Sequence, residues 1–202
     1  MKVGKACARD MKTAIKVIKK MKCEKTSMKF VNLGPIIEWS LEAYGDAGFK
    51  SLPDKLSSCS GYVLLLRNTK NGVSSILNWK SIKIKRVVGS STAAEALATN
   101  DALDGLVYIK YVLKELLGGV IDNVPLDMFT DSKNLHNAVH TLTLVENPRL
   151  RTDIAKLKES IENGELNSFL YVPGRRMIAD VLTKKGASGF RIMNMLQTGK
   201  YE

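Results

Sequence analysis

The chain has 202 residues, of which 45% are hydrophobic and 25% are charged. These ordinary globular values exclude the compositions of disordered, collagen-like and low-complexity chains. No segment approaches the ~18 consecutive apolar residues of a membrane span, and the N-terminal lysines are not followed by the apolar stretch of a secretory signal. Three cysteines without a CxxC pair are typical of free thiols in a reducing compartment. We therefore expect a protein without membrane partners that is not secreted and works in the cytoplasm or nucleus.

The net charge of +11 is distributed unevenly along the chain. Residues 1–30 contain ten basic and two acidic side chains, a net charge of +8, so the other 172 residues carry only +3. A second basic cluster consists of Lys80, Lys83, Lys85 and Arg86. A lone basic run is usually a solvated surface, but two in a chain of this size favour a polyanionic partner such as a nucleic acid.

The N-terminal segment predicts a helix that is separate from the main domain. From about residue 5 to 22 apolar side chains recur at helical spacing, and lysines occupy the other faces, so this amphipathic helix must dock on something. The sequence Asn32-Leu33-Gly34-Pro35 ends the segment. We therefore divide the chain into a basic helical connector at 1–34, a main domain at 35–186, and a C-terminal helix or tail at 187–202.

The main domain begins with three predicted strands. Polar and apolar residues alternate from Ile36 to Asp46, and the apolar run at 61–66 predicts a more buried strand. Lys70-Asn71-Gly72 is typical of a hairpin turn, and a third strand follows from Val73 to about Lys80. Three successive strands joined in this way predict an antiparallel meander.

Helices and two further strands follow. The predicted order is a helix from Thr92 to Gly118, a strand at 126–130, helices at 132–140 and around 150–161, a strand at 168–172, and short helices at 176–184 and 190–196. A strand–helix–strand unit extends a sheet with parallel strands. The sequence thus predicts an α/β fold with a mixed five-stranded sheet, in which three antiparallel strands are followed by parallel strands and helices cover the faces.

Common catalytic and phosphate-binding motifs are absent from the sequence. It contains no GxxxxGK[ST] loop, no GxGxxG after a strand, no HExxH and no GxSxG. The two histidines, His136 and His140, have no cysteine or carboxylate at zinc-like spacing, so we interpret them as a structural pair. A Ser-His-Asp triad has no support from spacing, which leaves the carboxylates as candidates.

Four carboxylates stand where predicted strands end or helices begin: Asp46, Glu95, Asp131 and Asp180. Each also has an ordinary structural interpretation. Glu95 would complete a capping box with Thr92, and Asp131 would cap the helix that follows it. Asp180 would pair with the lysine four residues later, and Asp46 would begin a turn.

Taken together, these four side chains favour a metal site. Carboxylates gathered at one edge of a sheet repel one another unless divalent cations neutralise them. Donor sets made only of oxygen suit Mg²⁺ or Mn²⁺, and two such ions about 4 Å apart can clamp the attacking water and the leaving oxygen of a phosphodiester. An acidic centre combined with basic surface predicts a nuclease.

Six segments carry a family resemblance: 44–49 (YGDAGF), 60–63 (SGYV), 90–97 (SSTAAEAL), 129–133 (FTDSK), 171–173 (YVP) and 178–184 (IADVLTK). In order and spacing they resemble the ribonuclease H domain that ends the Pol polyprotein of copia-type LTR retrotransposons. The resemblance covers about residues 36–186, and the basic segment at 5–30 is similar to the connection from the reverse transcriptase upstream.

This resemblance implies a function and a set of site residues. By motif, Asp46, Glu95, Asp131 and Asp180 would be the catalytic carboxylates that bind two Mg²⁺ ions, which Mn²⁺ could replace. The implied reaction is hydrolysis of the RNA strand of an RNA·DNA hybrid, in the cytoplasm, within virus-like particles, or in the nucleus. The implied partners are the hybrid and the reverse transcriptase domain of the same polyprotein. Residues expected to bind nucleic acid are Lys80, Lys83, Lys85, Arg86, Ser132, Lys133 and Asn134.

The sequence also departs from cellular enzymes of the family it resembles. Those enzymes carry a histidine shortly before the last carboxylate, and residues 141–179 contain none. The basic, tryptophan-containing insertion of the cellular enzymes is also missing between residues 132 and 165. Two alternatives therefore remain beside an active ribonuclease H. One is an inactive, retroelement-derived module that binds nucleic acid or assembles, and the other is a different metal nuclease on the same fold.

Overall fold

The computed structural model describes residues 7–23, 27–54, 56–141 and 145–201. Its strands are β1 (Trp39–Gly48), β2 (Cys59–Asn68), β3 (Ser74–Lys83), β4 (Leu126–Thr130) and β5 (Ser168–Tyr171). Its α-helices are α1 (Ala8–Cys23), α2 (Ser91–Leu117), α3 (Lys133–His140), α4 (Pro148–Glu162), α5 (Asp180–Thr183) and α6 (Phe190–Thr198). Three 3-10 helices are η1 (Ile36–Glu38), η2 (Gly118–Asn123) and η3 (Gly174–Arg176).

The five strands form one mixed sheet in the order β3-β2-β1-β4-β5. The pairs β1–β2 and β2–β3 are antiparallel, whereas β1–β4 and β4–β5 are parallel. The predicted turn at Gly72 lies between β2 and β3, and its φ of +72° is one that glycine adopts without strain. The predicted meander and its extension by parallel strands are confirmed, and with them the predicted fold class.

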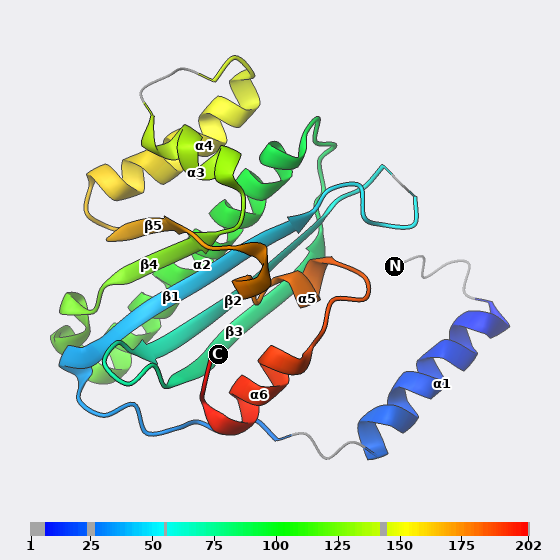
Figure 1. The fold of residues 1–202 in the computed structure, drawn as a ribbon, viewed down its shortest axis with the longest axis horizontal. Coiled ribbons are helices and arrows are strands. Elements are labelled where there is room, and N and C mark those ends of the chain that lie inside the picture. The colour runs from blue at the N-terminus through cyan, green and yellow to red at the C-terminus, as the bar shows by residue number, and fades with distance from the viewer. Residues whose placement is uncertain (1–6, 24–26, 55, 142–144, 202) are drawn as a thin grey trace.

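Helices cover both faces of the sheet (Figure 1). On one face, Leu41 and Ala43 of β1 belong to the main core cluster together with Leu103 and Leu106 of α2, and α3 and α4 contribute to the same cluster. On the other face, Tyr44 packs in a second cluster that includes residues of α6. Alternation along β1 therefore sends successive side chains into different cores.

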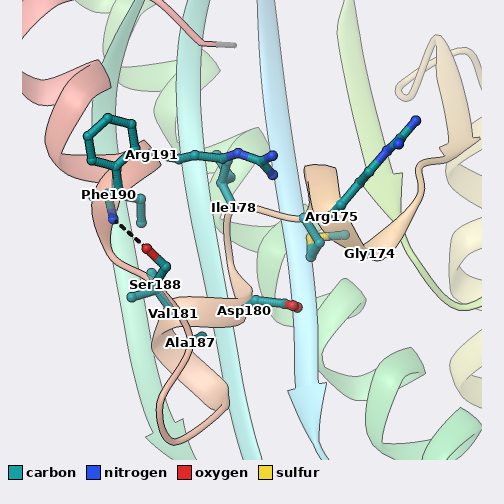
Figure 2. Close-up of a pocket in the computed structure, with 11 residues that line it drawn as sticks. Gly174, Arg175, Ile178, Asp180, Val181, Ala187, Ser188, Phe190 and Arg191 are labelled. Carbon is teal, nitrogen blue, oxygen red and sulfur yellow. Dashed lines mark hydrogen bonds between the residues drawn. The ribbon is translucent and has the colours of Figure 1, made fainter.

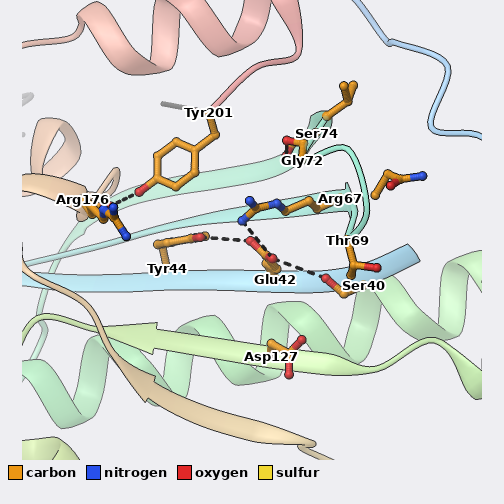
Figure 3. Close-up of polar contacts among 12 residues, drawn as sticks. Ser40, Glu42, Tyr44, Arg67, Thr69, Gly72, Ser74, Asp127, Arg176 and Tyr201 are labelled. Atoms are coloured by element: carbon orange, nitrogen blue, oxygen red, sulfur yellow. Dashed lines mark hydrogen bonds and ion pairs between the residues drawn. The ribbon is translucent and has the colours of Figure 1, made fainter. Parts of the chain in front are cut away.

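A buried polar group interrupts the second face of the sheet (Figure 3). Glu42 is 5% exposed, and its carboxylate accepts hydrogen bonds from Tyr44 (3.0 Å), Ser40 (3.4 Å) and Arg67 (3.4 Å). Burial raises the pKa of Glu42, and the charge of Arg67 opposes this rise. With these partners Glu42 is a satisfied structural residue in the middle of β1.

The segment before the sheet and the C-terminal helix pack together on β3. The backbone N–H of Lys29 donates to the carbonyl of Leu196 (2.9 Å), and that of Val31 donates to Ser75 (3.3 Å). The side chain of Leu33 is buried in the main core. The segment at 29–33 and α6 thus both contact β3. In the sequence, one precedes and the other follows the main domain that we predicted at 35–186.

The predicted N-terminal helix is present as α1, but it does not dock. Every residue of Ala8–Cys23 is exposed, including Met11, Ile15 and Met21 of its apolar stripe, and in Figure 1 the helix stands apart from the sheet. The docking that we expected from the amphipathic pattern is therefore not found within the described part of this chain. None of the described helices has the length and apolarity to cross a membrane.

The start of α2 differs from the prediction. Ser90, not Thr92, is the N-cap, and its hydroxyl accepts a hydrogen bond from the backbone N–H of Ala93 (3.1 Å). With Ser90 as the N-cap, the capping-box glutamate would stand at position 93, so Glu95 lies two residues too far along the helix, and this structural interpretation of Glu95 is wrong.

This cap supplies a test that separates helix stability from function. Changing Ser90 to Ala should lower the free energy of unfolding by about 1 kcal/mol because one N–H at the helix start loses its acceptor. Activity should stay unchanged, since Ser90 has no contact with the carboxylates described below. Urea unfolding of the wild type and variant measures the difference, with Thr92→Ala as the matched control that should cost less.

The predicted helix at 176–184 is shorter in the structure. Gly174–Arg176 forms a 3-10 turn, and α5 consists only of Asp180–Thr183. Between them Met177, Ile178 and Ala179 are all buried, with at most 3% of each exposed. Three consecutive buried residues do not fit one face of a helix, so burial takes precedence over helix propensity there.

Candidate metal centre

Three carboxylates meet at one edge of the sheet. Asp46 lies near the end of β1, Asp131 follows β4 directly, and Asp180 is the first residue of α5. Each offers an oxygen, and these oxygens lie within 4.8 Å of one another. Because β1 and β4 are adjacent and parallel, their carboxyl ends reach the same edge. Asp46 does not close its strand as predicted, since β1 continues to Gly48.

Glu95 approaches the same cluster from the second turn of α2. It is 8% exposed, and the nearby backbone N–H of Ala47 acts to lower its pKa. Burial is the main cause that raises its pKa to about 9, and the negative charges of Asp46 and Asp131 add to the rise. The four carboxylates chosen from the sequence thus influence one another in the folded chain.

Glycines allow the elements that carry these carboxylates to approach the sheet. A Cβ at Gly45 would lie 3.2 Å from the Cα of Thr99, so α2 packs directly on β1 beside Asp46. A Cβ at Gly61 would lie 2.7 Å from Cγ2 of Thr183, and one at Gly48 would lie 2.6 Å from the carbonyl oxygen of Thr183. The absence of side chains at Gly48 and Gly61 lets α5 lie against β1 and β2 with Asp180 near Asp46.

The close approach at Gly61 predicts a measurable effect on the centre. Gly61→Ala should displace α5 and cost about 1–3 kcal/mol of stability because the new methyl group has no room. It should also weaken binding of divalent cations, although no carboxylate has changed. Metal-dependent thermal shifts measure both effects. Gly89→Ala is the control, since a Cβ there meets nothing within 4 Å; an equal effect in both variants would contradict the argument.

Two neighbours of Asp180 complete the contacts of Asp46. The hydroxyl of Thr183 donates a hydrogen bond to Oδ2 of Asp46, which is fully buried. The ammonium of Lys184 lies 2.7 Å from Asp180, 3.3 Å from Asp46 and 3.6 Å from Asp131. The i,i+4 pair of Asp180 and Lys184 that the sequence suggested is therefore real, and the same lysine also reaches the other two aspartates.

The carboxylates of the cluster carry more negative charge than Lys184 can neutralise, and their pKa values reflect this. Burial raises the pKa of Asp131 and of Asp180, and the charge of Asp46 adds to both rises. Burial lowers the pKa of Lys184, but the hydrogen bond to Asp180 and the charges of Asp46 and Asp131 outweigh this and raise it. One ammonium thus faces at least three carboxylates.

The residues present fit a divalent cation. Oε2 of Glu95 is buried and accepts no hydrogen bond from any described residue; Oδ1 of Asp46 accepts none either, and the ammonium of Lys184 lies 3.3 Å from it. A buried carboxylate oxygen without a hydrogen bond is costly, and a bound cation reduces that cost. The donors are all oxygen atoms, which suits Mg²⁺ or Mn²⁺. Asp46, Asp131 and Asp180 would hold the ion, with Glu95 beside them.

The residues expected to bind nucleic acid are less free than their charges suggest. Arg86 forms an ion pair with Asp153, Lys83 pairs with Asp54 (3.1 Å), and Lys80 lies 4.0 Å from Asp101. Within the described residues Lys85 has no such partner. This basic cluster, which begins on β3 and continues beyond its end, is therefore partly neutralised by the chain's own carboxylates, which sequence spacing does not show.

The residues after Asp131 form the first turn of α3. Ser132 is the N-cap and accepts a hydrogen bond from the backbone N–H of Leu135 (3.3 Å). Lys133 stands over the ring of Tyr171 at 5.4 Å, and Asn134 is exposed. All three directly follow Asp131 in the chain. Ser132, not Asp131, caps the helix, so the capping interpretation of Asp131 is wrong.

The two histidines form a structural pair, as interpreted from the sequence. Their rings on α3 lie 4.5 Å apart, and Nε2 of His140 hydrogen-bonds the carbonyl of Phe169 on β5 (2.9 Å). The residue of this site that sequence reasoning missed is Thr183. Thr183 and its contact with Asp46 could have been suspected from its position three residues after Asp180 on a predicted helix.

Comparison with solved structures identifies the fold. LC11-RNase H1, isolated from compost by a metagenomic approach, superposes with a TM-score of 0.51 at 19% identity, covering 71% of this chain and 92% of that one. The same enzyme in complex with an RNA/DNA hybrid gives a TM-score of 0.51 at 18% identity, covering 71% and 94%. No protein-family profile and no curated protein matches the sequence. The chain therefore has the ribonuclease H-like fold.

Proposed function

We propose that this protein is a metal-dependent endoribonuclease that hydrolyses the RNA strand of RNA·DNA hybrids. The observation that carries the proposal is the meeting of Asp46, Asp131 and Asp180 within 4.8 Å at the edge of a ribonuclease H-like sheet. Glu95 lies against the same group. The similarity to a ribonuclease H1 solved with an RNA/DNA hybrid supports the choice of substrate.

The chain's own side chains have defined roles in this proposal. Asp46, Asp131 and Asp180 bind Mg²⁺ or Mn²⁺ ions, which supply activation of the attacking water and stabilisation of the leaving 3′-oxygen. Thr183 holds Oδ2 of Asp46 through its hydrogen bond, which would leave Oδ1 to hold a cation. Lys184 compensates the carboxylates while no ion is bound.

The sequence resemblance supports a retrotransposon origin. In this part of the proposal the domain belongs to a copia-type Pol polyprotein and acts with its reverse transcriptase, inside cytoplasmic particles or in the nucleus. Residues 1–34 are then the connector from the polymerase and 35–186 the catalytic domain. The exposed apolar stripe of α1 is consistent with a connector whose partner surface lies outside this chain.

The direct test is cleavage of a labelled RNA·DNA hybrid with Mg²⁺ or Mn²⁺, beside double-stranded RNA of the same sequence. We expect cleavage of the hybrid alone. Cleavage of neither, with a melting temperature that still rises in millimolar Mg²⁺, would mean that the metal site is intact and the substrate is bound too weakly. Cleavage of both duplexes would contradict the proposed specificity and favour another nuclease on this fold.

One observation favours an inactive binding module as the second candidate. The ammonium of Lys184 already contacts three carboxylates, and a lysine fixed there could replace the metal permanently. In that case neither Mg²⁺ nor Mn²⁺ should change the melting temperature, and no duplex should be cleaved. Binding of hybrid without any metal effect would support this candidate.

A further inference from the structure

A pocket outside the carboxylate cluster shares one wall with it. It has a volume of about 370 Å³ and is bounded by η3, α5 and the start of α6 (Figure 2). Asp180 is one of its lining residues, so the pocket begins where the candidate metal centre ends. Volumes of about 300–1,000 Å³ are typical of small-ligand sites, and this one has room for a nucleotide unit.

Two arginines line this pocket, Arg175 from η3 and Arg191 from α6. Neither forms an ion pair with any residue that the structure describes, and the cation that pairs with Asp180 is Lys184. In Figure 2 Arg191 extends towards Ile178, and Arg175 points away from the carboxylate of Asp180. The two guanidinium groups therefore keep their charge available for a ligand.

The surroundings of the arginines add to the positive potential. Burial raises the pKa of Tyr201, and the charges of Arg191 and Arg176 oppose that rise, so both arginines lie near the phenol. The hydroxyl of Tyr201 donates to the backbone carbonyl of Arg176 (Figure 3). Arg176 of η3 and Arg191 of α6 thus both lie near Tyr201, close to the C-terminus, and Arg175 and Arg191 line the pocket itself.

The pocket also offers an apolar surface at its rim. Phe190 lines it with 74% of its surface exposed, and the backbone N–H of Phe190 is held by the hydroxyl of Ser188 (3.3 Å). An exposed aromatic ring beside arginines is the combination with which proteins hold single-stranded or frayed nucleotides, by stacking and by contacts with phosphate.

We propose that this pocket binds a backbone phosphate of the nucleic acid next to the scissile linkage, through Arg175 and Arg191, with Phe190 against the adjoining sugar or base. The proposal rests on the proposed function for the identity of the ligand as a nucleic acid. In this proposal Arg175 and Arg191 provide much of the affinity for the substrate. The basic cluster at Lys80–Arg86 contributes less, because three of its four side chains already lie next to carboxylates of the chain. The bound phosphate fixes the strand relative to Asp180.

The experiment is a charge-deletion cycle on a short RNA·DNA hybrid, with binding measured at low salt in EDTA, where cleavage cannot interfere. Each backbone phosphate in turn is replaced by an uncharged methylphosphonate. Arg175→Gln/Arg191→Gln should bind the unmodified hybrid about tenfold or more weakly because charge-assisted hydrogen bonds to phosphate are lost. The slope of log affinity against log salt should fall by about 0.9 for each lost contact.

The decisive result is the coupling between protein and substrate. One or two adjacent methylphosphonates should weaken binding of the wild type and leave that of the double variant unchanged. The matched control, Arg149→Gln/Arg151→Gln, removes two charges from α4 on the opposite face of the sheet and should retain the wild-type pattern. A wild type indifferent to every methylphosphonate, no binding of the hybrid, or equal losses in variant and control would overturn the proposal.

Cleavage is assayed separately, so failure of the proposed function can be recognised. A wild type that shows the coupled positions but never cleaves would refute the ribonuclease activity and leave the phosphate pocket standing. A wild type that cleaves, with no coupled position, would refute the pocket alone.

Discussion

Asp131→Asn should reduce cleavage of an RNA·DNA hybrid by about 10²-fold or more, while the protein keeps its fold. The substitution removes one negative charge from the cluster and changes little volume, so the remaining carboxylates hold the cations less tightly and less accurately. Burial and the charge of Asp46 raise the pKa of Asp131, which means that its ionised form is under strain in the metal-free protein. The stability of that state should therefore stay equal or increase.

Opposite effects on activity and stability distinguish a ligand from a structural residue. Asp127→Asn is the matched control, because Asp127 lies on β4, the strand that Asp131 follows, and accepts a hydrogen bond from Ser168 away from the cluster. It should leave cleavage close to that of the wild type. Steady-state cleavage and urea unfolding of both variants measure the two quantities. A wild-type rate in Asp131→Asn would remove Asp131 from the site.

The sheet was predictable because its strands carry local signals. The alternation in β1, the turn before β3 and the apolar run of β2 are determined by neighbouring residues and required no knowledge of distant contacts. The one-turn helix at α5 was not predictable in its length, because burial of Met177, Ile178 and Ala179 by other elements decides where it begins. The exposure of α1 could not be predicted either, because its sequence pattern specifies an apolar face but not the surface on which that face packs.

Asp46 and Asp131 could be selected because parallel strands deliver their ends to one edge, a rule of topology that the sequence reveals, whereas Glu95 and Asp180 were selected as helix residues expected to face that edge. The contacts of Lys184 with the carboxylates could be predicted only in part. Its i,i+4 spacing from Asp180 was visible, but its contacts with Asp46 and Asp131 depend on how closely α5 packs on Gly48 and Gly61. The neutralisation of the β3 cluster was missed for the same reason: Arg86 and Asp153 are 67 residues apart.

The protein without divalent cations should lose stability as the pH rises from about 4.5 towards 9. Burial and the neighbouring aspartates raise the pKa of Glu95 from 4.5 to about 9, so the folded protein holds a proton that the unfolded chain releases. A raised carboxyl pKa favours the folded state fully below the unfolded pKa, and this contribution is lost as the pH approaches the folded pKa. Asp131 and Asp180 have raised pKa values and act in the same direction.

Mg²⁺ should reverse this loss, because the cation stabilises the ionised carboxylates and binds only the folded chain. Melting temperatures recorded between pH 5 and 9, in EDTA and in Mg²⁺, measure this loss of stability and its reversal. A change of 1 kcal/mol in the free energy of unfolding corresponds to about 2–4 °C for a protein of this size. Glu95→Gln removes the main titrating group and should flatten the EDTA profile, while Glu162→Gln on the exposed end of α4 should not. A wild-type profile that rises with pH in EDTA would contradict the assignment of Glu95 as a buried member of the cluster.

The same Glu95→Gln variant should lose hybrid cleavage, which joins the stability argument to the chemistry of the site.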